Sequence, residues 1–94
     1  MIEEEDGRYV IRGAITIANA RSLLDESMNL FRNDGPLVVD FSGAEEVDSS
    51  AVSLMLEWMR QARGSNRQIR FCKLPANLKS LATLYGVLEL IPAE

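Results

Sequence analysis

A short, nearly apolar segment followed by a long amphipathic one constrains the fold of this chain more than any other feature. Leu37 to Phe41 is apolar apart from Asp40, which is typical of a strand buried on both faces of a sheet. From Ala51 to Arg63 the apolar residues recur with helical spacing. A buried strand that leads into a helix is the repeating unit of folds in which helices cover a sheet. We therefore expect an α/β protein.

Further segments of both kinds alternate along the 94 residues. In chain order, the strand-prone and helix-prone segments are residues 8–12, 14–17, 20–31, 37–41, 51–63, 68–72 and 78–85. The predicted order is strand, strand, helix, strand, helix, strand, helix, which places helices against a mixed sheet. A chain of this length suits one domain, so we expect a single domain over residues 1–94.

The first and third predicted helices each have a defined apolar face. Their expected core residues are Ala20, Leu23, Leu24, Met28, Phe31, Leu78, Leu81, Ala82 and Tyr85. Between the ordered segments we expect residues 42–46 to form a loop. Residues 33–36 should end the first helix, with Gly35 in the left-handed conformation. Residues 1–7 are an acidic leader that we expect to fray.

Charge and residue types exclude several classes of function. The net charge is −4, so the basic surface that nonspecific nucleic-acid binding needs is missing. There is no histidine, the commonest general base and metal ligand, and no glycine-rich phosphate loop, so we expect no catalysis, cofactor or metal. The chain start lacks the basic and apolar regions of a signal peptide, and no apolar run approaches the ~20 residues that span a bilayer. We expect a cytoplasmic protein that does not insert into a membrane.

Asp48, Ser49 and Ser50 lie at the junction between the buried strand and the second helix. The first N–H groups of a helix have no partner within the helix, and Asp and Ser are preferred residues to cap them. One interpretation is that Asp48 or Ser49 caps the helix and has no further role. The other is that Ser49 is presented at the helix N-terminus as a docking or regulatory point. Both interpretations need the same residue types, so local chemistry leaves them open.

The outer side of the second helix is the candidate docking face. At ~100° per residue from Ser49, Ser53 and Arg60 fall on the polar side, Leu56 lies at its border and Trp58 faces the core. Small hydroxyls beside a partly exposed leucine, with an arginine at the edge, suit a protein-docking patch. The alternative is that Leu56 folds into the core and the serines are only solvated.

Two clusters of charged residues accompany this helix. The basic cluster consists of Arg60, Arg63, Arg67 and Arg70. Arginines near a helix C-terminus stabilise its dipole, and binding of an acidic partner is the alternative. The acidic cluster consists of Asp40, Glu45, Glu46 and Asp48. Paired acids can transfer protons or hold Mg²⁺, which would make the chain a small enzyme or nucleotide binder, but we expect structural or solvated roles.

The residues around the junction resemble the STAS domain family. The resemblance rests on the Leu- and Met-rich second helix and on the segments Val38-Val39-Asp40-Phe41-Ser42-Gly43 and Val47-Asp48-Ser49-Ser50-Ala51. The best-known members are anti-sigma factor antagonists, with the pattern Asp-Ser-Ser-Gly and a partner kinase that phosphorylates the serine after the aspartate. Ser49 matches that serine, and Ala51 replaces the glycine. The resemblance implies a STAS-domain sandwich: a mixed, mostly parallel sheet with about four helices, the fourth over residues 87–91.

The second half of the chain is similar to one branch of the family, the MlaB-type STAS domains. The similar segments are residues 56–63, 69–71, 74–75, 81–87 and 91–92. MlaB is the cytoplasmic STAS subunit of the Mla phospholipid ABC transporter, which maintains outer-membrane lipid asymmetry, and the hydroxyl at its junction is important for binding the ATPase subunit MlaF. The similarity implies a non-catalytic regulatory subunit, peripheral to the inner membrane through its ATPase partner. The residues expected to bind that partner are Asp48, Ser49, Ser50, Ser53, Leu56 and Arg60.

An anti-sigma factor antagonist is the alternative within the same family. In that role Ser49 would be phosphorylated by a serine kinase in a partner switch with an anti-sigma factor. Neighbouring genes for an ABC ATPase and permease would favour the transporter subunit, and genes for a serine kinase and a sigma factor would favour the antagonist. The enzyme or nucleotide binder built on the acidic cluster is the hypothesis from another class.

Overall fold

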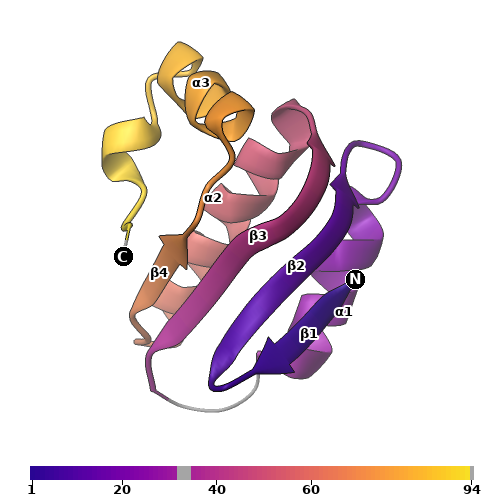
Figure 1. The fold of residues 1–94 in the computed structure, drawn as a ribbon. Helices are drawn as coiled ribbons and strands as arrows, with labels where there is room; N and C mark the ends of the chain where they lie inside the picture. The colour runs from indigo at the N-terminus through magenta and orange to yellow at the C-terminus, as the bar shows by residue number, and fades with distance from the viewer. Residues whose placement is uncertain (32–34, 94) are drawn as a thin grey trace.

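The computed structural model describes residues 1–31 and 35–93. Within them the chain forms four strands, three α-helices and a short 3-10 helix (Figure 1). In chain order the elements are β1 (Ile2–Glu5), β2 (Arg8–Ile15), α1 (Ala20–Leu30), β3 (Leu37–Val47), α2 (Ser49–Gly64), β4 (Ile69–Cys72), α3 (Ala76–Leu84) and η1 (Leu88–Leu90). The predicted α/β class is confirmed. The short turn η1 stands where a fourth helix was implied, and Asn33 and Asp34, expected to end the first helix, lie outside the described residues.

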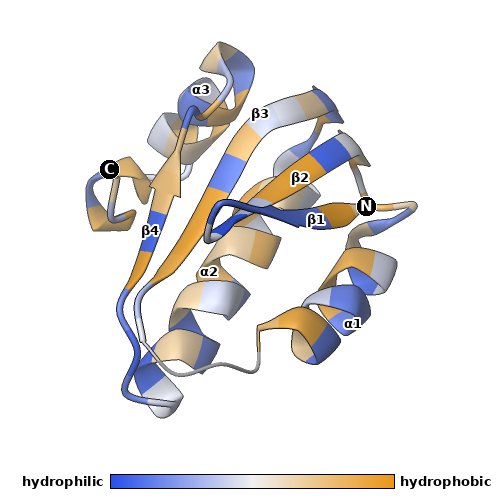
Figure 2. Cartoon of the chain, turned by 60° about the horizontal axis from the view of Figure 1, so that its bottom comes forward, coloured by the Kyte–Doolittle hydropathy of each residue, from blue (hydrophilic) through white to orange (hydrophobic). Residues whose placement is uncertain are grey.

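The strands form one mixed sheet in the order β1-β2-β3-β4. β1 runs antiparallel to β2, whereas β2, β3 and β4 are parallel, as the STAS resemblance implied. α1 and α2 lie against one face of this sheet, and α3 packs beside α2 (Figure 1). Hydrophobic residues of the strands run through the middle of the molecule (Figure 2). No helix of the described part of the chain has both the length and the apolar character needed to cross a bilayer.

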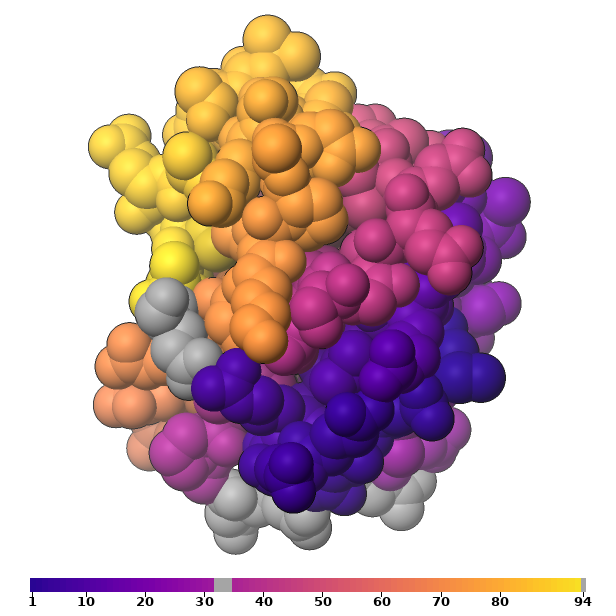
Figure 3. All heavy atoms as spheres, in the orientation of Figure 1, coloured from indigo at the N-terminus to yellow at the C-terminus, as the bar shows by residue number. Residues whose placement is uncertain are grey.

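The acidic leader is ordered, so the expectation that residues 1–7 fray is wrong. Asp6 and Gly7 both have positive φ, 52° and 81°, which is the geometry of a two-residue hairpin turn between β1 and β2. Ile2 is buried, and its N–H donates to the Glu26 carboxylate on α1 at 2.8 Å. Backbone pairing and one buried side chain therefore hold a charged segment in place. In the space-filling view the indigo atoms of this hairpin form the lower part of the visible face, and the orange atoms of α3 form its upper part (Figure 3).

Two segments that the sequence predicted to interrupt the strands are instead parts of continuous strands. β2 continues through Gly13, and β3 continues through residues 42–46, which the sequence predicted to be a loop. The pairs Arg12–Gly43 and Gly13–Ala44 extend the parallel ladder, with irregular register on either side. A Cβ on Gly43 would lie 3.0 Å from the Arg12 side chain, so the strands approach closely there. Pairing with β2 supplies hydrogen-bond partners for this polar stretch, which therefore forms strand without an apolar face.

α1 and α2 are joined in the core by a buried polar contact. The indole N–H of Trp58 on α2 donates to Ser27 Oγ on α1 at 2.8 Å, and both side chains are almost fully buried. A buried indole needs an acceptor, so α1 turns Ser27 inward, beside Leu23. Met28, expected in the core, is consequently 58% exposed. Tyr85, also expected in the core, is 53% exposed because it follows the last residue of α3.

Candidate docking site at the N-terminus of α2

Asp48 is the cap of α2, which decides between the two candidate capping residues. One carboxylate oxygen accepts the Ser50 N–H at 2.8 Å, and the other accepts the Ile17 N–H at 3.1 Å. These two bonds, first from Ile17 and then from Ser50, lower the pKa of Asp48 below its ordinary value. The charged carboxylate therefore ties the loop between β2 and α1 to the start of α2.

Ser49 is the first residue of α2, and its side chain is exposed. Among the described residues its hydroxyl forms no hydrogen bond, and the neighbouring Ser50 N–H is bound by Asp48. The Ser49 hydroxyl is thus presented to solvent at the positive end of the helix dipole. The neighbouring Ser50 is half-buried. Of the two junction serines, Ser49 is therefore the one whose side chain a partner protein can reach more fully.

Four of the predicted site residues share the outward side of α2. Ser49, Ser53, Leu56 and Arg60 fall within roughly 60° of one another around the helix axis; we call them the outer stripe. Ser53 and Arg60 are exposed, and Leu56 is half-buried with one side packed against the core. The predicted partial exposure of Leu56 is confirmed. The outer stripe is a continuous surface of small hydroxyls, one aliphatic side chain and one arginine.

A groove runs between α1 and α2 beside the outer stripe. It has a volume of about 340 Å³. Its lining residues are Ala20, Arg21, Leu24, Ser50, Ser53, Leu54 and Glu57. Ser53 belongs to both the groove and the outer stripe, and Ser50 lines the groove wall. A side chain that entered this groove from a partner would therefore contact both serines.

Arg60 is held at the end of the outer stripe by Glu57. Its Nη2 and Nε atoms donate to the two Glu57 carboxylate oxygens at 2.9 and 3.2 Å. Hydrogen bonding from Arg60, supported by Gln61, lowers the pKa of Glu57 despite partial desolvation. An exposed pair of this kind adds little to stability. Its effect is to fix the direction of a charged side chain at the rim of the stripe.

A family model described as "Mlab, STAS domain" matches residues 2–92. The match includes all the strands and helices of the described residues, together with every residue of the outer stripe. The chain belongs to the STAS domain family. This STAS domain has no match among curated protein sequences.

Solved structures share the fold of this STAS domain at low sequence identity. SpoIIAA, an anti-sigma factor antagonist solved in its unphosphorylated form, has a TM-score of 0.74 and 14% identity, covering 100% of this chain and 86% of SpoIIAA. A protein from Thermotoga maritima described as an anti-sigma factor antagonist has a TM-score of 0.79 and 11% identity, covering 99% of this chain and 83% of that one. At these identities the likeness establishes the fold.

Sequence inspection missed Ile17, a residue of the STAS domain that lies next to the outer stripe. Its side chain is 83% exposed, and its N–H donates to the second carboxylate oxygen of Asp48. Ile15, two residues earlier, is the last residue of β2 and is fully buried. The apolar pair suggested a continuing strand, but the chain leaves the sheet after Ile15. An exposed isoleucine whose backbone is tied to Asp48 adds apolar area near the start of α2.

The acidic residues that lie close in sequence, which could have formed a site only in the alternative hypothesis, form no metal-binding group among the described residues. These residues are Asp40, Glu45, Glu46 and Asp48, and within residues 1–31 and 35–93 no group of three or more acidic, histidine or cysteine side chains is placed to hold a metal. Asp40 is buried in the sheet. Burial raises its pKa, but hydrogen bonds from Ser42 and the charges of Lys73 and Arg8 outweigh that effect and leave the pKa lowered. Asp40 is a charged structural residue.

The structure also divides the basic cluster. Arg60 pairs with Glu57. Arg67 donates to the backbone carbonyl oxygens of Phe31 and Gly35, at 2.9 Å each, and so fastens the chain around the link from α1 to β3. Arg63 and Arg70 are exposed at the opposite end of α2 from Ser49. The four arginines therefore do not act as one site.

Proposed function

We propose that this STAS domain is a non-catalytic regulatory subunit that binds the ATPase of a phospholipid ABC transporter. The proposal rests on the outer stripe, whose hydroxyls, leucine and flanking Ile17 are presented at the fixed N-terminus of α2. The family description, which names MlaB, supports this choice of partner. The domain would then lie at the inner membrane, on its cytoplasmic side, through the ATPase.

The chemistry of the outer stripe suits a neutral, partly apolar partner surface. Ser49 and Ser53 offer small hydroxyls that can donate or accept, so little charge is desolvated when they are covered. Leu56 and Ile17 supply apolar area, and Arg60 lies at the rim where water remains. A partner side chain in the groove between α1 and α2 would complete the contact. Asp48 acts by positioning, since both of its oxygens bind backbone N–H groups.

A charge on Ser49 tests the proposal. Ser49→Asp places a carboxylate next to Asp48, in an interface with no designed counter-ion, so the dissociation constant for the ATPase should rise by at least about tenfold. The Tm should stay within a few degrees of the parent because the helix N-terminus tolerates negative charge. Ser80→Asp, at an exposed serine on α3, is the matched control and should leave binding unchanged. Co-purification with the ATPase and calorimetric melting measure the two effects. Parent-like binding by Ser49→Asp would overturn the proposed contact.

An anti-sigma factor antagonist remains the second candidate because the Ser49 hydroxyl is exposed at a helix N-terminus. That position gives a phosphate nearby N–H groups, although the Asp48 charge opposes it. Capture of partners from native extract, with intact-mass measurement of the domain, separates the two roles. The transporter role predicts an ATPase partner and unmodified Ser49. A serine kinase partner with phosphorylated Ser49 would establish the antagonist role instead.

A further inference from the structure

β4 is an edge strand of the sheet, and only half of its outer side is covered. The Phe71 N–H donates to the Pro92 carbonyl oxygen at 2.8 Å, and Phe71 forms an isolated parallel bridge with Ala93. The Gln68 carbonyl points inward, toward β3, and accepts the N–H of Leu37 at 2.8 Å. Because backbone groups alternate along a strand, those of Ile69 also point outward. Within the described residues, neither the N–H nor the carbonyl oxygen of Ile69 forms a hydrogen bond.

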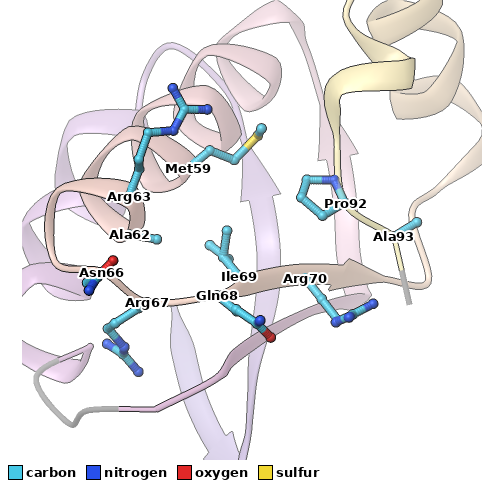
Figure 4. Close-up of a pocket in the computed structure, with 10 residues that line it drawn as sticks. All are labelled: Met59, Ala62, Arg63, Asn66, Arg67, Gln68, Ile69, Arg70, Pro92 and Ala93. Carbon is cyan, nitrogen blue, oxygen red and sulfur yellow. The ribbon is translucent and has the colours of Figure 1, made fainter.

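A groove lies along this uncovered part of the edge. Its volume is about 580 Å³, which is large enough for a short peptide segment. The residues that matter for the groove are Met59, Arg63, Ile69, Arg70 and Pro92. Figure 4 shows Met59 on α2 extending toward Pro92 above Ile69, and Arg63 on α2 with its guanidinium directed away from β4, whereas Arg70 projects from the opposite side of β4. The groove thus has an apolar floor on the helix side and an arginine on each side of the strand.

The charge of the groove is opposite to that of the whole chain. The net charge is −4, yet every charged residue among the described lining residues is an arginine. Arg63 is not needed to cap α2, because the N–H groups of Ser65, Asn66 and Arg67 already bind its last carbonyl oxygens at 2.8 to 3.2 Å. Neither Arg63 nor Arg70 forms an ion pair within the described residues. Both guanidinium groups are therefore available to an acidic ligand.

We propose that the free edge of β4 binds an extended acidic segment of a protein partner as an added strand. The backbone of that segment would pair with the N–H and carbonyl groups of Ile69. Alternate side chains of an added strand point to opposite faces of the sheet. Apolar ones would therefore pack against Met59 and Pro92, and carboxylates would meet Arg70, with Arg63 at the rim of the helix side. The outward backbone groups favour a peptide over a simple anion, which would need only the arginines. This site is separate from the outer stripe.

Binding of a fluorescent peptide with the sequence Glu-Val-Glu-Val-Glu tests this proposal. We expect saturable binding by the full chain, measured by anisotropy, weakening by at least about tenfold in Arg70→Ala, and a smaller loss in Arg63→Ala, whose side chain lies at the rim. Lys79→Ala removes the same charge from the exposed side of α3 and should bind like the parent. A peptide N-methylated at the central residues keeps the charges but loses strand pairing, so it should bind weakly. In NMR spectra the Ile69 amide should shift and gain exchange protection.

Other outcomes of the same measurements would overturn the proposal. Equal binding of the N-methylated and unmodified peptides would show charge attraction without strand addition. If inorganic phosphate displaced the peptide fully, the groove would be an anion site. If phosphatidylglycerol vesicles bound more tightly than the peptide, it would be a lipid site. Absence of peptide binding by a correctly folded parent would also refute it, and circular dichroism supplies that check. The ATPase interaction is measured separately, so either proposal can fail while the other stands.

Discussion

The two faces of α2 have the same backbone geometry but opposite properties. The inward face buries Trp58 and Met55 almost completely and is fixed by the hydrogen bond from Trp58 to Ser27 on α1. The outward face presents Ser49 and Ser53, whose side chains are solvated. The inward face is constrained by packing and by a polar atom that must be satisfied. The outward face has no such packing constraint, so its residues can be suited to a binding partner.

Leu56 lies at the boundary between these two faces. It is half-buried and packed against the core, yet it belongs to the outer stripe. Asp48 has a similar intermediate position, because it caps the helix and also fixes the loop that carries Ile17. Substitutions on the inward face of α2 should therefore change mainly stability, and those on the outward face mainly binding. Substitutions of Leu56 and Asp48 should change both. Each of the following substitutions tests that separation.

The largest effect on stability is expected from Trp58→Ala. Removing a buried indole leaves a cavity and should lower the free energy of unfolding by about 3–5 kcal/mol. Trp58→Phe is the matched control, since it keeps an aromatic ring and loses mainly the bond to Ser27, and its loss should be smaller. Denaturant unfolding followed by circular dichroism measures both. A loss under about 1 kcal/mol for Trp58→Ala would contradict the assigned core.

Leu56→Asp should affect binding more than folding. A carboxylate buried in a desolvated contact should cost about 2 kcal/mol, or roughly thirtyfold in affinity for the ATPase. The domain should still fold, because one side of Leu56 already faces solvent. Leu84→Asp introduces the same charge at a 74% exposed leucine on α3 and should leave affinity unchanged. Gross unfolding of Leu56→Asp would place Leu56 on the inward face.

Asp48 should give a pH-dependent contribution to stability. Its pKa is lowered in the folded state by the N–H groups of Ile17 and Ser50, so its contribution is complete above the unfolded pKa of about 3.9. The contribution is lost as pH falls through the lower folded pKa. Asp48→Asn keeps a capping oxygen without the charge, so the Tm difference from the parent should shrink as pH falls from about 7 to about 3. Melting curves across that range check this, and a difference independent of pH would refute the role of the charge.

Ser49→Ala should have the smallest effect of the series. Asp48 rather than Ser49 caps α2, so the Tm should remain within about a degree of the parent. Loss of one solvated hydroxyl should weaken ATPase binding only slightly, and less than Ser49→Asp does. Parallel melting and affinity measurements compare the two variants. A substantial loss of Tm in Ser49→Ala would mean that the serine shares the capping role.

Periodicity predicted the elements that build the centre of the molecule. The apolar run from Leu37 to Phe41, the face of α2 and the alternation around Phe71 each depend on neighbours close in sequence, and all three agree with the structure. The helical spacing also placed Leu56 at the boundary of the core. The Asp6-Gly7 turn that orders the leader was present in the sequence as a hairpin signal, but the acidic composition of the leader obscured it.

Tertiary contacts decided the features that involve residues distant in sequence. Asp48 was selected as the cap because the Ile17 N–H reaches its second oxygen from another loop. The polar end of β3 became strand because β2 supplies its hydrogen bonds. Ser27 replaced Met28 in the core because Trp58, 31 residues away, needs an acceptor. In each case a polar group needed a hydrogen-bond partner from a distant part of the chain. Local residue patterns cannot predict which residue that partner is.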